Sequence, residues 1–169
     1  MSKLYIITGP AGVGKSTISI KIAESLEKSV LLEGDDFYHQ VVGSYVPAWK
    51  DGNHLDVFWK VCIDTIKTYL DNGYDVVFNY IISKDKFLEL KEIFSSYEMK
   101  FILLMVNEET IVKRDKLRPI DCQMGERSII LLNSFKKYDF PENFILYTDD
   151  LSVDNVVVKI MEDNIFICN

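Results

Sequence analysis

Residues 9–16 of this 169-residue chain read GPAGVGKS and place glycines, a lysine and a serine at a spacing that suits phosphate groups. Gly9, Gly12 and Gly14 let the backbone curl so that its N–H groups point into one anion-sized hollow. Lys15 is expected to bridge the β- and γ-phosphates of a nucleoside triphosphate, and the Ser16 hydroxyl to hold Mg²⁺. The motif therefore predicts triphosphate binding but not what is done with the triphosphate. The predicted phosphate-binding residues of this loop are Gly9, Ala11, Gly12, Val13, Gly14, Lys15, Ser16 and Thr17.

Two carboxylates follow in the stretch LLEGDDFYH (31–39), where Asp35 and Asp36 stand at the expected end of a second strand. A carboxylate at that edge can accept the proton of an attacking hydroxyl, or hold a water on Mg²⁺. The competing interpretation is a solvated turn or a helix N-cap, where Asp is common. We assign Asp35 as the candidate base and Asp36 as a supporting, metal-water or acceptor-side residue.

All three arginines of the chain, Arg114, Arg118 and Arg127, lie within KRDKLRPIDCQMGERS (113–128). A guanidinium fork suits the oxygens of a transferring phosphoryl group better than an ammonium group does. Arg114 and Arg118 are four residues apart, so on a helix they share one face. The alternative is that Arg114 pairs with a nearby acid, Glu108 or Asp121. Three arginines together favour a phosphate clamp.

The hydrophobic pattern predicts the scaffold that brings these residues together. Apolar runs predict strands at 3–8, 29–34, 74–82, 100–106 and 143–148. Helical spacing predicts helices at 15–28, from Leu55 to the Asn72-Gly73 pair, 87–97, from about Ile111 to Arg118, 126–137 and from Ser152 onward. Strands that alternate with helices predict a parallel sheet covered on both faces, with its ligand at the carboxyl ends of the strands.

The composition predicts one globular domain over residues 1–169, with 48% hydrophobic and 27% charged residues. A net charge of −7 argues against a nucleic-acid or anionic-membrane partner, because such partners need a basic face. No run approaches the ~20 apolar residues of a membrane span. Cys62, Cys122 and Cys168 are odd in number and widely spaced, so we expect reduced thiols and a cytoplasmic protein.

Taken together, GPAGVGKST and GDDFYH resemble the small P-loop kinases, such as gluconate kinase, uridine-type nucleoside kinases and chloramphenicol phosphotransferases. The resemblance implies an α/β, three-layer P-loop NTPase fold with a five-stranded parallel sheet, helices on both faces and a short lid. It also implies ATP and Mg²⁺ as cofactors and an acidic residue after the second strand that activates the acceptor hydroxyl. The lid falls at about 118–126, where arginines of such kinases close over the phosphates. Lys15, Asp35, Arg114 and Arg118 are therefore the candidate catalytic residues, with Arg127 a further phosphate ligand and Ser16 and Asp36 the candidate metal residues.

Two departures from related kinases bear on the substrate and the metal. The chain has no arginine before Arg114 and lacks the GGG that shikimate kinases show after their third strand. A neutral or weakly charged alcohol is therefore expected, unless Lys50 or Lys60 binds an anion. Many P-loop enzymes end the third strand with an aspartate, whereas this chain has Asn79. This substitution leaves more of the metal role to Ser16 and to Asp35 or Asp36.

The segment 37–54, FYHQVVGSYVPAWKDGNH, is expected to form the acceptor side of the cleft. Its candidate acceptor-binding residues are His39, Tyr45, Trp49 and His54, together with Asp36. Thr148, after the fifth predicted strand, is the candidate adenine contact.

The sequence thus predicts an ATP-dependent kinase for a hydroxyl of a small molecule such as a sugar, sugar acid, nucleoside or antibiotic. ATP and that acceptor are the expected partners of a monomer or homodimer. The alternatives are an NTP-hydrolysing switch and a nucleotide-binding regulatory protein with weak catalysis. A GTPase is disfavoured because VNEET (106–110) stands where a guanine-binding N-K-x-D motif would be.

Overall fold

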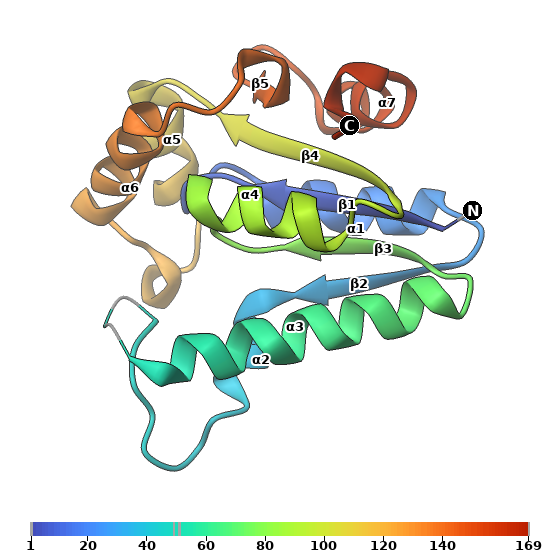
Figure 1. Ribbon diagram of the computed structural model, residues 1–169. Helices are drawn as coiled ribbons and strands as arrows, with labels where there is room; N and C mark the ends of the chain where they lie inside the picture. Colours follow the sequence, from blue (N-terminus) through green and yellow to red (C-terminus); the bar gives the residue numbers. More distant parts are fainter. Residues whose placement is uncertain (1, 49, 51, 169) are drawn as a thin grey trace.

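The strands of this chain form a single parallel sheet whose carboxyl ends all point to the same edge (Figure 1). The computed structural model describes residues 2–48, 50 and 52–168. Within these residues the strands are β1 (Lys3–Thr8), β2 (Ser29–Glu33), β3 (Asp75–Asn79), β4 (Glu98–Met105) and β5 (Ile145–Tyr147). Their order across the sheet is β2-β3-β1-β4-β5. This confirms the predicted α/β fold with a five-stranded parallel sheet.

The helices lie on both faces of the sheet and at its carboxyl edge. They are α1 (Lys15–Ser25), α2 (Gly34–His39), α3 (Asn53–Asp71), α4 (Lys84–Ile93), α5 (Glu108–Lys116), α6 (Glu126–Lys137) and α7 (Val153–Glu162). Short 3-10 turns occur at Ile120–Cys122, Glu142–Phe144 and Asn164–Phe166. Among the described residues, none of these helices combines the length and the apolar character that a bilayer span requires.

Two adjacent residues of β4 show how the layers are built, because neighbouring strand residues point to opposite faces. The ring of Phe101 packs against Phe87 of α4, with 4.3 Å between ring centres. The buried amine of Lys100 donates instead to the last carbonyls of α7, including Ile160 at 2.9 Å and Met161 at 2.9 Å. One face of the sheet is thus covered by α3 and α4, and the other by α1 and α7 (Figure 1).

Most element boundaries agree with the sequence pattern, and the differences lie at both edges of the sheet. β3 ends at Asn79 rather than at 82, because the chain then crosses the sheet edge and the N–H of Ile82 donates to Thr8 Oγ1 at 2.9 Å. Asp35 and Asp36 lie in the first turn of the short helix α2 rather than in a strand-end turn. α1 ends at Ser25, three residues before the predicted end.

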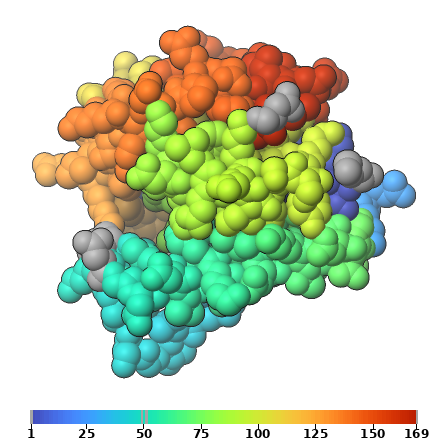
Figure 2. All heavy atoms as spheres, viewed as in Figure 1, coloured from blue at the N-terminus to red at the C-terminus, as the bar shows by residue number. Residues whose placement is uncertain are grey.

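Two segments flank the carboxyl edge. One is the lid, residues 118–126, between α5 and α6. The other is the α2–α3 segment, residues 40–48, 50 and 52. Figure 2 shows both at the same end of the molecule, the lid in orange and the α2–α3 segment in cyan. Side chains from both segments line a cavity of about 1100 Å³.

Candidate active site

The phosphate loop joins β1 to α1 at the floor of this cavity. Its glycines have positive φ values, 143° at Gly9, 83° at Gly12 and 108° at Gly14, which side chains rarely adopt. Gly9 is also required for space, because a Cβ there would lie 2.4 Å from the carbonyl oxygen of Leu104. The loop is therefore shaped by its backbone and held against β4, as a motif that binds through N–H groups requires.

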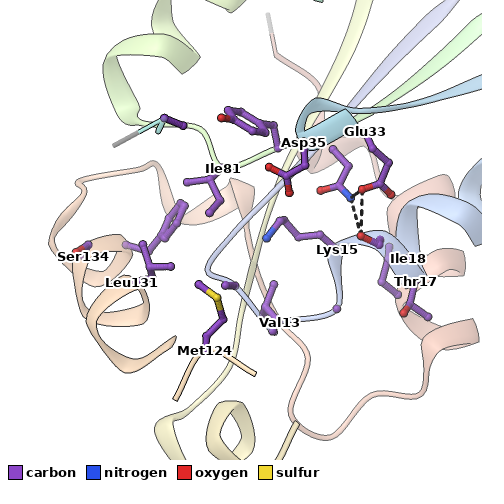
Figure 3. Close-up of a pocket in the computed structure, with 18 of the residues that line it drawn as sticks. Val13, Lys15, Thr17, Ile18, Glu33, Asp35, Ile81, Met124, Leu131 and Ser134 are labelled. Carbon is purple, nitrogen blue, oxygen red and sulfur yellow. Dashed lines mark hydrogen bonds between the residues drawn. The ribbon is translucent and has the colours of Figure 1, made fainter. Parts of the chain in front are cut away.

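Lys15 begins α1, and its side chain enters the cavity on the side of Asp35 (Figure 3). Its amine donates to the carbonyls of Gly9 at 3.0 Å and Pro10 at 3.1 Å. Burial lowers the pKa of Lys15 to about 8, and the charges of Asp35 and Glu33 partly oppose that shift. The amine therefore folds over its own loop, charged at neutral pH, close to both carboxylates.

Ser16 belongs to a cluster that the sequence did not predict. Its hydroxyl donates to Glu33 Oε2 at 3.2 Å, while the Asn79 amide donates to the same carboxylate oxygen at 3.0 Å and to the Ser16 hydroxyl oxygen at 3.1 Å (Figure 3). Glu33 and Asn79 are the last residues of two neighbouring strands and stand opposite each other in register. Glu33 is thus a functional candidate that the search for motifs missed, although the strand-end rule points to its position.

The donor set of this cluster fits Mg²⁺, which prefers oxygen ligands and keeps several waters when it is bound with phosphates. A hydroxyl and a carboxylate meet at Ser16 and Glu33. In the described part of the chain, no group of three acidic, His or Cys side chains could hold a metal by itself. A metal here would therefore depend on nucleotide phosphates and water for its remaining ligands.

The two aspartates of α2 are both exposed, but they differ in their position relative to the cavity. Asp35 lines the cavity, and Figure 3 shows its carboxylate above Lys15. Asp36 is exposed and is not among the residues that line the cavity. The helix begins at Gly34, where a Cβ would lie 2.4 Å from Cδ2 of Tyr80, so glycine lets the Tyr80 ring pack beside Asp35.

Arg114 is held by backbone and hydroxyl groups rather than by acids. Its Nη1 donates to the Val13 carbonyl at 2.7 Å and to Thr148 Oγ1 at 3.3 Å, and its Nη2 donates to the Thr148 carbonyl at 3.0 Å. Glu108, one of the acids considered for it, pairs with Lys136 at 3.6 Å. Arg114 thus joins the phosphate loop to the start of the segment after β5.

Arg118 lies beyond α5, which ends at Lys116 shortly before Pro119, so the two arginines reach the cavity from a helix and from the lid. Arg118 Nη1 lies 3.5 Å from Asp115 Oδ1. This nitrogen is buried and has no hydrogen-bond partner among the described residues. The Arg118 side chain also lines the cavity, so its guanidinium can exchange the ion pair with Asp115 for an oxyanion there.

Asp115 anchors the far end of the lid. Its carboxylate accepts the N–H groups of Met124 at 3.0 and 3.1 Å and of Gly125 at 2.8 Å. Those bonds, with Met124 foremost and Arg118 adding to them, lower the pKa of Asp115. The side chain therefore connects α5, the start of the lid and the start of α6. Arg127, in the first turn of α6, also lines the cavity.

Thr148 is 4% exposed, and its hydroxyl and carbonyl already accept hydrogen bonds from Arg114. Leu151, Val153 and Val156 line the cavity with it. The part of the cavity beside Thr148 therefore has an apolar surface on which a flat group can pack. The adenine assignment of Thr148 stays a prediction.

The acceptor-side prediction is only partly reflected in the structure. His39 and Tyr45 line the cavity, and Trp49 lies outside the described residues. His54 is outside the lining and packs edge-on against Tyr38, with ring centres 6.2 Å apart. Sequence analysis missed Trp59, because its place in the cavity depends on how α3 packs on the sheet.

No protein-family model matches this chain, and neither does any curated protein sequence. Solved structures do match. The tunicamycin resistance protein of Deinococcus radiodurans superposes with a TM-score of 0.68 at 16% identity, covering 100% of this chain and 99% of that one. A gluconokinase of Sinorhizobium meliloti 1021 superposes with a TM-score of 0.67 at 17% identity, covering 94% of this chain and 89% of that one. Mycobacterium tuberculosis APS kinase, in complex with AMPPNP and APS, superposes with a TM-score of 0.68 at 15% identity, covering 96% of this chain and 98% of that one. The chain has the fold of the small P-loop kinases.

Proposed function

We propose that this protein is an ATP-dependent kinase that transfers the γ-phosphoryl group to a hydroxyl of a small molecule. The observation that carries the proposal is that Lys15 and Asp35 enter one cavity, with Arg114, Arg118 and Arg127 also lining it. A site that only bound nucleotide would not need a carboxylate facing the end of the phosphate chain. The structural neighbours, which include a gluconokinase and an APS kinase, support the same reaction class.

In this proposal the phosphate loop and the lid hold the triphosphate from opposite sides. The backbone N–H groups between Gly9 and Ser16 and the start of α1 bind the β-phosphate region. Lys15 exchanges its bonds to the Gly9 and Pro10 carbonyls for phosphate oxygens. Arg118, which lines the cavity, turns its guanidinium from Asp115 to the transferring group, where negative charge spreads over the equatorial oxygens.

Ser16, Glu33 and Asn79 are the residues that would hold Mg²⁺ and its waters. Glu33 supplies the carboxylate that many P-loop enzymes carry at the position of Asn79, and Asn79 orients it through a 3.0 Å hydrogen bond. When bound, Mg²⁺ neutralises charge on the phosphate oxygens during transfer.

Asp35 is the proposed base. The acceptor hydroxyl oxygen forms a bond to the γ-phosphorus while the bond from that phosphorus to the β–γ bridging oxygen breaks. The hydroxyl proton passes to the Asp35 carboxylate, and ADP leaves with the bridging oxygen. Asp35 suits this role because it lies between the phosphate side of the cavity, at Lys15, and the side that carries Tyr80.

The proposal is tested by a screen for ADP release with ATP, Mg²⁺ and a set of alcohols. A kinase releases ADP only when its acceptor is present. ADP release at the same rate without any alcohol would indicate an NTP-hydrolysing switch instead. Nucleotide binding with no ADP release under any condition would indicate a regulatory module.

A further inference from the structure

One side of the cavity is built of interlocked aromatic rings. Tyr38, Tyr45, Trp59 and Tyr80 line the cavity, and we call these four residues the aromatic wall. The buried ring of Phe58 holds three of them, with ring centres 5.4 Å from Tyr38, 5.1 Å from Trp59 and 4.8 Å from Tyr80. Tyr45 joins through Tyr38 at 5.7 Å. Rings fixed in this way form a preorganised surface, which favours a rigid, flat ligand.

Apolar side chains from other elements also face the cavity. Figure 3 shows Ile81 after β3, Met124 of the lid and Leu131 of α6 pointing into it. Ile81 is 40% exposed and Tyr45 is 45% exposed, and both side chains line the cavity. Apolar surface exposed inside a cavity is typical of a binding site for an apolar group.

One polar group of the aromatic wall and the cation beside the wall are already engaged within the protein. The Tyr38 hydroxyl donates to the Val46 carbonyl. The amine of Lys86, the cation beside the wall, lies 4.9 Å from the centre of the Trp59 ring and pairs with Glu89. An anionic group placed on the wall would have to displace these partners. The wall therefore disfavours acceptors that carry a carboxylate or phosphate on this side.

The wall reaches the proposed base. Tyr80 packs directly on Gly34, the residue before Asp35, with only 2.4 Å between its Cδ2 and a Cβ built at that glycine. Burial raises the pKa of the Tyr80 hydroxyl, and the neighbouring Asp35 charge adds to this effect. A ring on the wall would thus place a hydroxyl attached near it beside the carboxylate.

We infer that the acceptor is an uncharged alcohol with a flat ring, aromatic or heteroaromatic, close to the reacting hydroxyl. The inference rests on the proposed function, since the acceptor is defined by the transfer reaction. It narrows that function by placing sugar acids and phosphorylated alcohols outside the substrate class.

The test separates this inference from the proposed function. Calorimetry with AMPPNP and Mg²⁺ first establishes nucleotide binding. ADP release is then measured with matched alcohols, namely phenyl β-D-glucoside against methyl β-D-glucoside, uridine against uridine 3′-monophosphate, and glucose against gluconate. Phenyl β-D-glucoside should give a higher kcat/KM than methyl β-D-glucoside by about tenfold or more, as expected for ring stacking. Uridine and glucose should each give a higher kcat/KM than their anionic counterparts, because the wall disfavours an anion.

Substitutions in the aromatic wall test whether its rings cause the preference for ring-bearing alcohols. Trp59→Ala and Tyr45→Ala should each raise KM for the ring-bearing alcohol by about five- to tenfold while the Kd for AMPPNP stays unchanged. Val61→Ala, on the exposed side of the same helix as Trp59, should change neither value. Tyr45 is largely exposed, so its variant remains informative if the Trp59 variant does not fold.

The inference is overturned if AMPPNP binds and gluconate, methyl glucoside or uridine 3′-monophosphate is accepted as well as the ring-bearing alcohols. It is also overturned if ADP release depends on alcohols without a flat ring and on no ring-bearing alcohol, or if both wall variants retain the wild-type KM. Failure to bind AMPPNP, or no ADP release with any alcohol, would instead refute the proposed function, and this inference with it.

Discussion

The two halves of the cavity are built by different means. The phosphate half is a short stretch of backbone, residues 9–16, whose glycines set its shape. The acceptor half is made of side chains from α2, α3, the β3–α4 connection, the lid and α6. In the proposed function, the first half binds a group common to every nucleoside triphosphate, whereas the second binds the acceptor that its side chains admit. Specificity can therefore change without disturbing phosphate binding, and the variants below test whether the halves are separable.

Asp35→Asn is expected to have the largest effect, because it removes the group at the boundary of the two halves. We predict that kcat falls by about 10²–10⁴-fold, the usual contribution of general-base catalysis. The Kd for AMPPNP should stay near its wild-type value, since the loop and lid hold the triphosphate. Steady-state kinetics and calorimetry on the same preparation measure both.

Asp36→Asn is the matched control, because Asp36 lies in the same helical turn but outside the cavity lining. It should leave kcat close to wild type. A large loss that raised Mg²⁺ partly rescues would return Asp36 to the metal role expected from the sequence. A dead Asp36 variant beside an active Asp35 variant would mean that the two roles are exchanged.

The pH dependence of nucleotide affinity tests the phosphate half alone, because it depends on the charge of Lys15. Its pKa in the free protein is about 8, and phosphate oxygens around the amine should raise that pKa in the complex. Nucleotide affinity should therefore be constant below pH 8 and fall by about tenfold per pH unit above it, until the pKa of the complex is reached. Lys15→Ala should bind weakly with no such slope. A wild-type Kd that does not change between pH 7 and pH 10 would contradict this placement of the amine.

Arg118→Lys should have a smaller effect, since it keeps the charge and loses the fork. We predict that kcat falls by about tenfold, more than AMPPNP affinity does, because the lost bonds matter most in transfer. Lys116→Arg, a charge-preserving change on the exposed end of α5, is the control. If Arg118→Lys lowers only the melting temperature, the arginine is structural.

Asp115→Asn should affect stability and lid order more than the phosphate half. Loss of charged hydrogen bonds to Met124 and Gly125 should lower the free energy of unfolding by about 1–3 kcal/mol. Because folding lowers the pKa of Asp115, its contribution is complete above the unfolded pKa of about 3.9 and declines as the pH falls below that value. The difference in the free energy of unfolding between the variant and the wild type should therefore become smaller at acidic pH. Asp121 is an exposed acid of the lid, so Asp121→Asn should leave the free energy of unfolding measured by urea denaturation unchanged.

The same contrast explains what the sequence could predict. The phosphate loop was predicted because eight consecutive residues and their flanking elements define it. The alternation of apolar runs predicted the sheet and its helices to within a few residues. The three arginines were found because they are rare and close together, and all three line the cavity.

Residues whose roles depend on distant packing were missed. Glu33 gains its position from the pairing of β2 with β3, which sets it opposite Asn79. Trp59 reaches the acceptor half only after α3 docks on the sheet, where its ring centre lies 5.6 Å from that of Tyr80. In the sequence Asp115 resembles any other charged residue of a helix. Its hydrogen bonds to Met124 and Gly125 form only when the end of the lid folds back against α5.

The most direct test of the central claim, that both halves act in one transfer reaction, follows the labelled γ-phosphoryl group of ATP in a single turnover. The protein is mixed with limiting γ-³²P ATP, Mg²⁺ and a ring-bearing alcohol accepted in the screen, and the products are separated. We predict that the label appears in the alcohol, in an amount equal to the ADP formed, and that Asp35→Asn slows its appearance. Label found instead in inorganic phosphate, at a rate that does not depend on the alcohol, would contradict the account.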